Sequence, residues 1–333
     1  MNNELRQDIV YGDWIVISSK RSKRPDQFTK KEKRIIAPVK GCPFENPQQS
    51  GHKKPILIYP TNTKKWRLQI FENKYPTFSP NGNDSKFRTP KIEKQGPYST
   101  IEALGYHNIV VTRDHHKNFA HLSSKEANLV FQAFQERYKM ITKQKCSAYV
   151  SIFHNWGPKA GASIYHPHYQ IISIPVVPPD IKHSLNGSTQ YFKKNKKCVH
   201  CSMIAWEKKN KKRIVYENKE AIVFTPFVSR EPFEMRIFPK KHFAYFEDFS
   251  KNEMKWVVEA LQKALIKIEK NLHDADYNFF IHTAPILEKN KYPYYHWHIE
   301  IQPKISISAG FELGTGIEVT VVDPDEAAKI LRR

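Results

Sequence analysis

Residues 163–174 read Ser-Ile-Tyr-His-Pro-His-Tyr-Gln-Ile-Ile-Ser-Ile, with polar side chains at every second position from His166 to Gln170. Successive side chains of a β-strand point to opposite faces, so His166, His168 and Gln170 share one face. Two imidazoles and an amide are costly to bury unless a ligand or a metal ion uses their hydrogen-bonding groups. The other interpretation is an exposed polar edge, but the isoleucine-rich residues 171–174 favour a buried strand. We therefore predict a functional site on this strand.

The composition is that of a globular protein long enough for two domains. The chain has 333 residues, of which 40% are apolar and 13% aromatic, which excludes a disordered chain. The start of the sequence lacks the apolar segment of a secretion signal, and no stretch approaches the roughly eighteen apolar residues of a membrane span. We expect a cytoplasmic protein with no membrane partner.

Basic residues outnumber acidic residues by 54 to 33, which gives a formal net charge of +21. Such an excess is typical of nucleic-acid-binding proteins. Here, however, much of it lies in lysine-rich runs, at residues 30–34, 193–197 and 208–213. We interpret these runs as solvated loops, and a positive field would also steer a phosphorylated small substrate. Nucleic acid is therefore an unlikely partner.

A repeated pattern divides the chain into two similar halves. Ser123-Ser-Lys-Glu126 has the form of a helix capping box, and apolar residues at helical spacing follow it. Adding 127 to each residue number reaches a second box, Ser250-Lys-Asn-Glu253, and moves His115 onto His242. The two apolar series are Ala127, Val130, Phe131, Phe134, Tyr138 and Ile141, and Met254, Val257, Val258, Leu261, Leu265 and Ile268. The chain therefore contains two copies of one unit.

Each copy has the same motifs in the same order: a CxxC motif or its remnant, Asn-Lys, a histidine before the long helix, and a final His-x-His strand. These motifs begin at Cys42, Asn73, His115 and His166 in the first copy, and at Cys198, Asn218, His242 and His296 in the second. One long helix among strands predicts an α+β fold of two tandem repeats, each an antiparallel sheet with a helix packed on it. We place the domains at residues 1–180 and 195–333, with a linker at 181–194.

The second copy has four residues suited to bind zinc: Cys198, Cys201, His242 and His296. Two thiolates and two imidazoles suit tetrahedral zinc, and four protein ligands leave no open position, so the role would be structural. The alternative is a packed CxxC turn with unrelated histidines, which leaves the repeat unexplained.

The first copy offers Cys42, His115 and His166, but Glu45 stands where the second cysteine is expected. Zinc accepts a carboxylate oxygen, so a site of one thiolate, one carboxylate and two imidazoles is one interpretation. The other is a lost site in which Glu45 forms a salt bridge.

The first copy is the better candidate for chemistry. His168 is followed by Gln170 and approached through Ser163 and Asn155, whereas the second copy has Glu300 at the place of Gln170. The negative charge of Glu300 would repel a phosphate. A neutral imidazole can attack phosphorus and form a phosphoramidate. Gln170 and Ser163 could donate hydrogen bonds to the non-bridging oxygens as charge builds.

The sequence resembles the galactose-1-phosphate uridylyltransferase branch of the histidine-triad superfamily, a two-repeat fold, over nearly its whole length. The motifs that carry the resemblance are Arg21-Ser-Lys-Arg24-Pro25, Gly41-Cys42-Pro43-Phe44, Asn73-Lys74-Tyr75-Pro76, Asp114-His115-His116-Lys117, Ser163 to Gln170, Cys198-Val-His-Cys201, His296-Trp-His298-Ile-Glu300 and residues 309–316.

The resemblance implies a role for each matching residue. His168 would be the nucleophile that takes the uridylyl group. The phosphates would be contacted by Gln170, Ser163 and Asn155, the phosphate or sugar phosphate by Arg21 and Arg24, the nucleotide by Asn73 and Lys74, and zinc by Cys42, His115 and His166. Two residues depart from the family pattern. Glu45 replaces a cysteine, and Tyr169 replaces a small residue but faces away from the catalytic row.

Three functions are compatible with these motifs. The first is a ping-pong nucleotidyltransferase that moves UMP from UDP-glucose to galactose 1-phosphate. The second is a phosphorylase or hydrolase that acts on an ADP-sugar or a dinucleoside polyphosphate. The third is a basic nucleic-acid-binding protein without turnover, against which the intact row from His166 to Gln170 argues. The expected partners are nucleotide sugars and sugar 1-phosphates, and a homodimer is compatible with the sequence.

Overall fold

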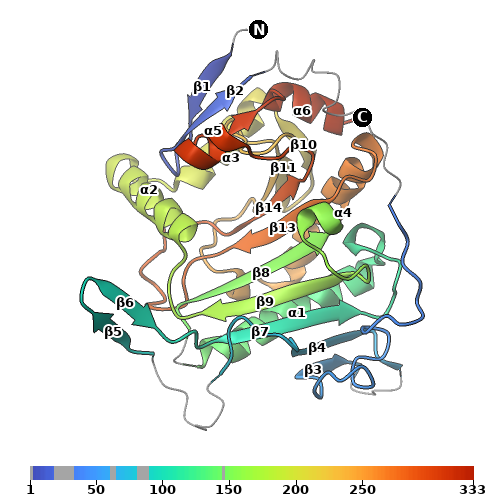
Figure 1. The fold of residues 1–333 in the computed structure, drawn as a ribbon. Helices are drawn as coiled ribbons and strands as arrows, with labels where there is room; N and C mark the ends of the chain where they lie inside the picture. Colours follow the sequence, from blue (N-terminus) through green and yellow to red (C-terminus); the bar gives the residue numbers. More distant parts are fainter. Residues whose placement is uncertain (1–2, 19–33, 61–64, 81–89, 145–146) are drawn as a thin grey trace.

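The computed structural model describes residues 3–18, 34–60, 65–80, 90–144 and 147–333. Its main feature is one sheet of ten strands in which every neighbouring pair is antiparallel (Figure 1). The strands follow one another across the sheet as β10 (Ile214–Glu217), β11 (Ala221–Phe224), β12 (Met235–Pro239), β14 (His298–Pro303), β13 (Tyr277–His282), β8 (Tyr149–Trp156), β9 (His168–Ile174), β7 (Tyr106–Thr112), β4 (Leu68–Glu72) and β3 (Leu57–Tyr59). The predicted α+β class is confirmed.

The two halves of the sequence form the two halves of this sheet. The strands of the first half run outward from β8 and those of the second half outward from β13, in mirrored order. The halves join where β8 pairs with β13, and Phe153 lies opposite Phe280 there. The sequence predicted one sheet per repeat. The two sheets instead merge, because pairing β8 with β13 removes two exposed strand edges.

Two long helices cover one face of the sheet. The first, α1 (Ser124–Thr142), begins after Ser123 with both hydrogen bonds of a capping box. The second, α4 (Lys251–Asn271), begins after Ser250, whose side chain accepts from the backbone N–H of Glu253. Every apolar residue predicted for these helices is buried. They form one core with the inward side chains of the strands, including Tyr169 and Ile171.

The N-terminal strands lie on the second half of the molecule, although their residues fall within the first predicted domain. Strand β1 (Glu4–Gln7) pairs with β2 (Trp14–Ile17), and β2 pairs in parallel with β15 (Val319–Thr320). Arg6 is 2.6 Å from Asp323, at the start of α6 (Pro324–Leu331). In Figure 1 the blue strands accordingly lie beside the red helix α6. This placement depends on contacts between distant segments, which local sequence patterns do not reveal.

The remaining elements lie around the main sheet. They are the ribbon of β5 (Ile92–Gln95) and β6 (Tyr98–Ile101), the 3-10 helices η3 (Phe119–His121), η4 (Pro158–Ala160) and η5 (Phe246–Asp248), and the helices α2 (Pro179–Asn195), α3 (Val199–Asn210) and α5 (Gly310–Thr315). Within the described residues, no helix has the length and apolar character needed to cross a membrane.

Residues 181–194 were predicted to be a linker, but they lie within helix α2. Pro179 occupies the first turn, where its missing N–H costs nothing, and lysines in the last turn complement the helix dipole. Ile181 and Leu185, one helical turn apart, are buried against Tyr149 and Tyr295. The Ser, Asn and Gly residues of this segment concealed that apolar pair.

Helix α2 approaches the N-terminal hairpin closely at Gly187. A Cβ placed on Gly187 would lie 1.7 Å from the backbone oxygen of Val10. We predict that Gly187→Ala lowers the free energy of unfolding by about 1–3 kcal/mol, although alanine normally stabilises a helix interior by about 1 kcal/mol relative to glycine. Urea unfolding measures the change. Gly314→Ala, where no atom lies within 4 Å of the new Cβ, is the control and should not destabilise. Equal effects of the two substitutions would contradict the close packing.

Candidate active site

The polar side chains of β9 lie on the face of the sheet opposite α1 and α4. His168 and Gln170 alternate with Tyr169 and Ile171, which belong to the core beneath those helices. Asn155 of β8 shares the face of His168, because its neighbour His154 pairs with Tyr169. The structure therefore brings three of the predicted active-site residues to one surface.

His168 is oriented by its own strand. Its Nδ1 donates a hydrogen bond to the backbone oxygen of His166 over 2.9 Å, which leaves the lone pair of the neutral ring on Nε2. The ring centroid lies 5.1 Å from that of Phe44. Burial lowers the pKa of His168, so the imidazole is neutral near pH 7. An uncharged imidazole with a lone pair on Nε2 is the form that can attack phosphorus.

The two amide side chains of this face are held through their oxygens. Gln170 Oε1 accepts from His107 Nε2 over 2.7 Å, and Asn155 Oδ1 accepts from Asn278 Nδ2 over 2.9 Å. Among the described residues, neither NH2 group makes a hydrogen bond, so each is available for a ligand. Sequence reasoning missed both partners. His107 belongs to none of the repeated motifs, and Asn278 belongs to the other half of the chain.

The other predicted substrate-binding residues lie around this face. Ser163 is exposed in the segment between η4 and β9. The backbone N–H of Asn73 donates to the backbone oxygen of His107, and Lys74 beside it is exposed. Arg21 and Arg24 lie outside the described residues.

The first predicted metal group converges beside His168. Glu45 Oε1 lies 3.2 Å from His115 Nδ1 and 3.3 Å from His166 Nδ1, and Cys42 Sγ lies 3.6 Å from His166 Nδ1. The far nitrogens donate to backbone oxygens, from His166 Nε2 to Thr112 over 2.8 Å and from His115 Nε2 to Ala37 over 3.0 Å. Both Nδ1 lone pairs therefore point at the carboxylate and the thiol.

This arrangement fits a metal ion better than a salt bridge. Burial lowers the pKa of His166 to about 4, so Glu45 faces a neutral ring at neutral pH. Glu45 Oε1 and His115 Nδ1 are buried and make no hydrogen bond among the described residues. Ligands at normal zinc distances in a tetrahedron lie about 3.3–3.6 Å apart, close to the 3.2, 3.3 and 3.6 Å of the three contacts given above. The ligand atoms of Cys42, His115 and His166 all lie within 4.8 Å of one another, so a cation between these three would satisfy them, with Glu45 Oε1 beside both imidazoles.

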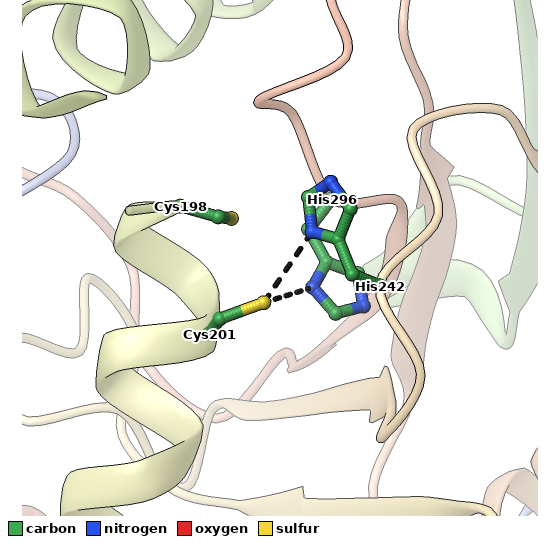
Figure 2. A group of neighbouring side chains, drawn as sticks. All are labelled: Cys198, Cys201, His242 and His296. Carbon is green, nitrogen blue, oxygen red and sulfur yellow. Dashed lines mark hydrogen bonds between the residues drawn. The ribbon is translucent and has the colours of Figure 1, made fainter. Parts of the chain in front are cut away.

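The second predicted metal group is equally compact (Figure 2). The ligand atoms of Cys198, Cys201, His242 and His296 all lie within 4.8 Å of one another. Cys201 Sγ is 3.3 Å from His242 Nδ1 and 3.5 Å from His296 Nδ1. Hydrogen bonding to Cys201 lowers the pKa of Cys198, and burial lowers the pKa of His296. A thiolate and a neutral imidazole are the charge states that metal binding requires.

The face of the second copy that corresponds to the candidate active site is filled by charged side chains. Glu300 lies opposite Arg236, with 3.5 Å between its Oε2 and the Arg236 Nε. Burial raises the pKa of Glu300, but the charge of Arg236 together with the interactions of His282 and His298 lowers it overall. Glu234 lies 2.9 Å from the same guanidinium. Asp8, at the turn of the N-terminal hairpin, lies 3.9 Å from it. In the first copy the partner of Gln170 is the apolar Ile109, so no charged pair corresponding to Glu300 and Arg236 forms at that position.

Comparison with known proteins agrees with this arrangement. A family model described as "Domain of unknown function (DUF4921)" matches residues 81–332. The chain is 32% identical over 332 residues to ADP-glucose phosphorylase of Arabidopsis thaliana, covering 99% of this chain and 92% of that protein. It is 28% identical to galactose-1-phosphate uridylyltransferase of Thermotoga maritima, covering 99% and 98%. The chain belongs to the galactose-1-phosphate uridylyltransferase family.

Solved structures of the uridylyltransferase family have the same fold over the full chain. The crystal structure of ADP-glucose phosphorylase from Arabidopsis thaliana with bound ADP-glucose has a TM-score of 0.85 and 30% identity, covering 100% of this chain and 99% of that one. A uridylyltransferase structure has a TM-score of 0.74 and 27% identity, covering 99% and 97%. The predicted family resemblance is confirmed.

The two ligand sets predict different metal affinities. The second group has two sulfur ligands and two imidazoles, whereas the first relies on the harder Glu45. We predict one to two bound metal ions per purified chain by elemental analysis. Cys198→Ser should remove one ion and lower the Tm by roughly 5–10 °C, because each lost kcal/mol shifts the Tm of a chain of this size by about 1–2 °C and a structural metal site contributes several kcal/mol.

Glu45→Gln should weaken the first site with a smaller shift in Tm. His116→Gln changes an exposed neighbour of His115 that belongs to neither group, and this control should keep the metal content of the wild type. A metal-free wild type, or an unchanged Cys198→Ser variant, would contradict the ligand assignment.

Proposed function

We propose that this chain transfers a nucleotidyl group from a nucleoside diphosphate sugar to a phosphate-bearing acceptor through a covalent bond to His168. The observation that carries this proposal is the state of His168, a buried neutral imidazole whose Nδ1 is bonded to His166 and whose Nε2 has the lone pair. Two amide NH2 groups on the same face support it, because hydrogen-bond donors stabilise the negative charge of a phosphoryl transition state.

In the first half-reaction, His168 Nε2 attacks the α-phosphorus of the nucleotide sugar. The bond from that phosphorus to the bridging oxygen breaks, and sugar 1-phosphate leaves with the electron pair. Positive charge develops on the ring, and the carbonyl of His166 stabilises it through Nδ1–H. Gln170 and Asn155 donate to the non-bridging oxygens. In the second half-reaction an acceptor phosphate oxygen attacks the same phosphorus, which frees His168.

Two candidate activities differ in the nucleotide that is transferred and in the acceptor that receives it. The motifs led first to transfer of UMP between UDP-glucose and a hexose 1-phosphate, with an ADP-sugar phosphorylase as the alternative. Similarity supports the alternative, because the plant ADP-glucose phosphorylase has higher identity and a higher TM-score than the uridylyltransferases compared above. We therefore propose phosphorolysis of an ADP-sugar by inorganic phosphate as the first candidate and uridylyl transfer as the second.

We assign zinc to both metal groups, because thiolate and imidazole ligands at tetrahedral spacing favour it over harder divalent ions. Zinc would supply rigidity and no step of the transfer. His166 belongs to the first group, and its carbonyl accepts the hydrogen bond from His168. A fixed His166 would therefore hold the nucleophile in position.

The covalent adduct identifies the nucleotide directly. Incubation of the wild type with ADP-glucose alone should add the mass of AMP to the protein and release glucose 1-phosphate in an amount no greater than the enzyme present. Adding inorganic phosphate should then release ADP and restore the original mass. An adduct formed only from UDP-glucose would select the uridylyltransferase. Continuous release without phosphate would identify a hydrolase.

Loss of the imidazole at position 168 should abolish transfer without unfolding the chain. We predict that His168→Gly lowers the overall rate at least about 10³-fold, since no nucleophile remains. Thermal unfolding and metal content should stay close to those of the wild type. His116→Gly is the matched control, because His116 is an exposed histidine outside the site, and it should keep full activity. Turnover by His168→Gly would rule out the covalent route.

A further inference from the structure

The catalytic face presents two amides, and the shape of an amide does not decide which end meets the substrate. Oxygen and NH2 are nearly the same size, so Gln170 and Asn155 could each be rotated by half a turn without a change in packing. Phosphate oxygens only accept hydrogen bonds. An amide that turned its oxygen toward the phosphate would therefore repel it. Only the orientation that turns the NH2 group toward the phosphate allows a hydrogen bond.

The orientation of Gln170 follows from the tautomer of His107. The backbone N–H of Thr77 lies 3.1 Å from His107 Nδ1, and a backbone N–H can only donate. Nδ1 is therefore unprotonated, and the neutral ring has its proton on Nε2. Burial lowers the pKa of His107, which keeps the ring neutral.

Two amide side chains, those of Asn73 and Gln170, lie next to the Nε2–H of His107, and only one of them can accept its hydrogen bond. Asn73 Nδ2 lies 3.0 Å from His107 Nε2, but an NH2 group cannot accept, and Asn73 Oδ1 already accepts from the N–H of Tyr75. Gln170 Oε1, at 2.7 Å, takes the proton. The Gln170 oxygen is thereby held on His107, and its NH2 group is left for the substrate.

The orientation of Asn155 follows from Asn278 by the same reasoning. Asn278 Nδ2 donates to the backbone oxygen of Ala160 over 2.8 Å. A carbonyl can only accept, so this contact places the NH2 end of Asn278 toward η4. The other N–H of the Asn278 NH2 group donates to Asn155 Oδ1. Asn155 Nδ2 then points toward Gly161, where an added Cβ would lie 3.7 Å away.

We infer that His107 and Asn278 are positioning residues, which hold Gln170 and Asn155 as hydrogen-bond donors to the phosphates of the nucleotide. The inference rests on the proposed function and deepens it. His107 lies on β7 of the first half and Asn278 on β13 of the second half. The second copy thus contributes to the site of the first although its own corresponding face is filled.

A double-mutant cycle tests whether each residue acts through its amide. The rate of nucleotidyl-enzyme formation is measured in one turnover with ADP-glucose, or with UDP-glucose if that is the donor. We expect His107→Leu to lower the rate about tenfold or more, with little change in substrate affinity. Without His107, the Gln170 NH2 group is no longer held where it donates to the transition state. In a Gln170→Ala background the same substitution should change the rate less than about twofold.

Asn278→Leu should behave in the same way, with a large effect in the wild type and little in an Asn155→Ala background. His107→Gln, which keeps an N–H donor at a similar reach, should recover most of the rate. Equal losses from His107→Leu with and without Gln170 would show a purely structural role and overturn the inference. Melting temperatures exclude general unfolding.

A second measurement needs no turnover. Side-chain ¹⁵N NMR of the full chain should show His107 protonated on Nε2. Addition of ADP should shift the NH2 signals of Gln170 and Asn155, and His107→Leu should abolish the shift of Gln170. Protonation on Nδ1, or a Gln170 shift that persists in His107→Leu, would overturn the inference. If these signals behave as expected but no nucleotide sugar forms an adduct, only the proposed function fails.

Discussion

The antiparallel pairing of β8 with β13 is the constraint on which the rest of the structure depends. It converts two five-stranded halves into one sheet and protects two central edges that would otherwise be open to other strands. It also places Asn278 directly opposite Asn155. The same backbone ladder thus completes the core under α1 and α4 and carries a polar contact on the opposite face.

The two halves share a framework and differ in the chemistry of one face. Each has a compact cluster of potential metal ligands whose last member lies two residues before the second histidine, at which the strand begins. In the first half that strand continues with an uncharged amide beside Ile109. In the second half the corresponding positions hold Glu300 and Arg236, enclosed by Glu234 and Asp8. A buried cluster of this kind adds little net stability, because desolvation offsets most of the attraction. Its clearest effect is to occupy the space.

Local patterns in the sequence were sufficient for much of this architecture. The periodicity and caps of the two long helices predicted α1 and α4, and alternation in residues 166–174 predicted which side of β9 is polar. The repeat predicted both clusters of ligands, because equivalent positions in two copies identify each other. These predictions depend on residues close in sequence or related by one offset.

Features that depend on contacts between distant segments were not predicted. The residue of the second copy that corresponds to His107 is Glu234, so comparison of the two copies did not single out His107. The role of His107 depends on its hydrogen bonds to Thr77 and Gln170. Asn278 is meaningful only once β13 is known to lie beside β8. The segment 181–194 has the composition of a loop, and its helix is stabilised by burial of Ile181 and Leu185 against residues from other parts of the chain.

The meeting point of Phe153 and Phe280 has a consequence for how such a molecule can diverge. These two residues are equivalent by the repeat offset, so the joint between the halves has the geometry of a self-complementary homodimer. In a true homodimer each position would appear twice, and the counterpart of Asn278, which is Ser151 here, would also have to be asparagine. Covalent fusion removes that obligation. One half can specialise in chemistry while the other becomes its support, a division of labour that identical subunits cannot adopt.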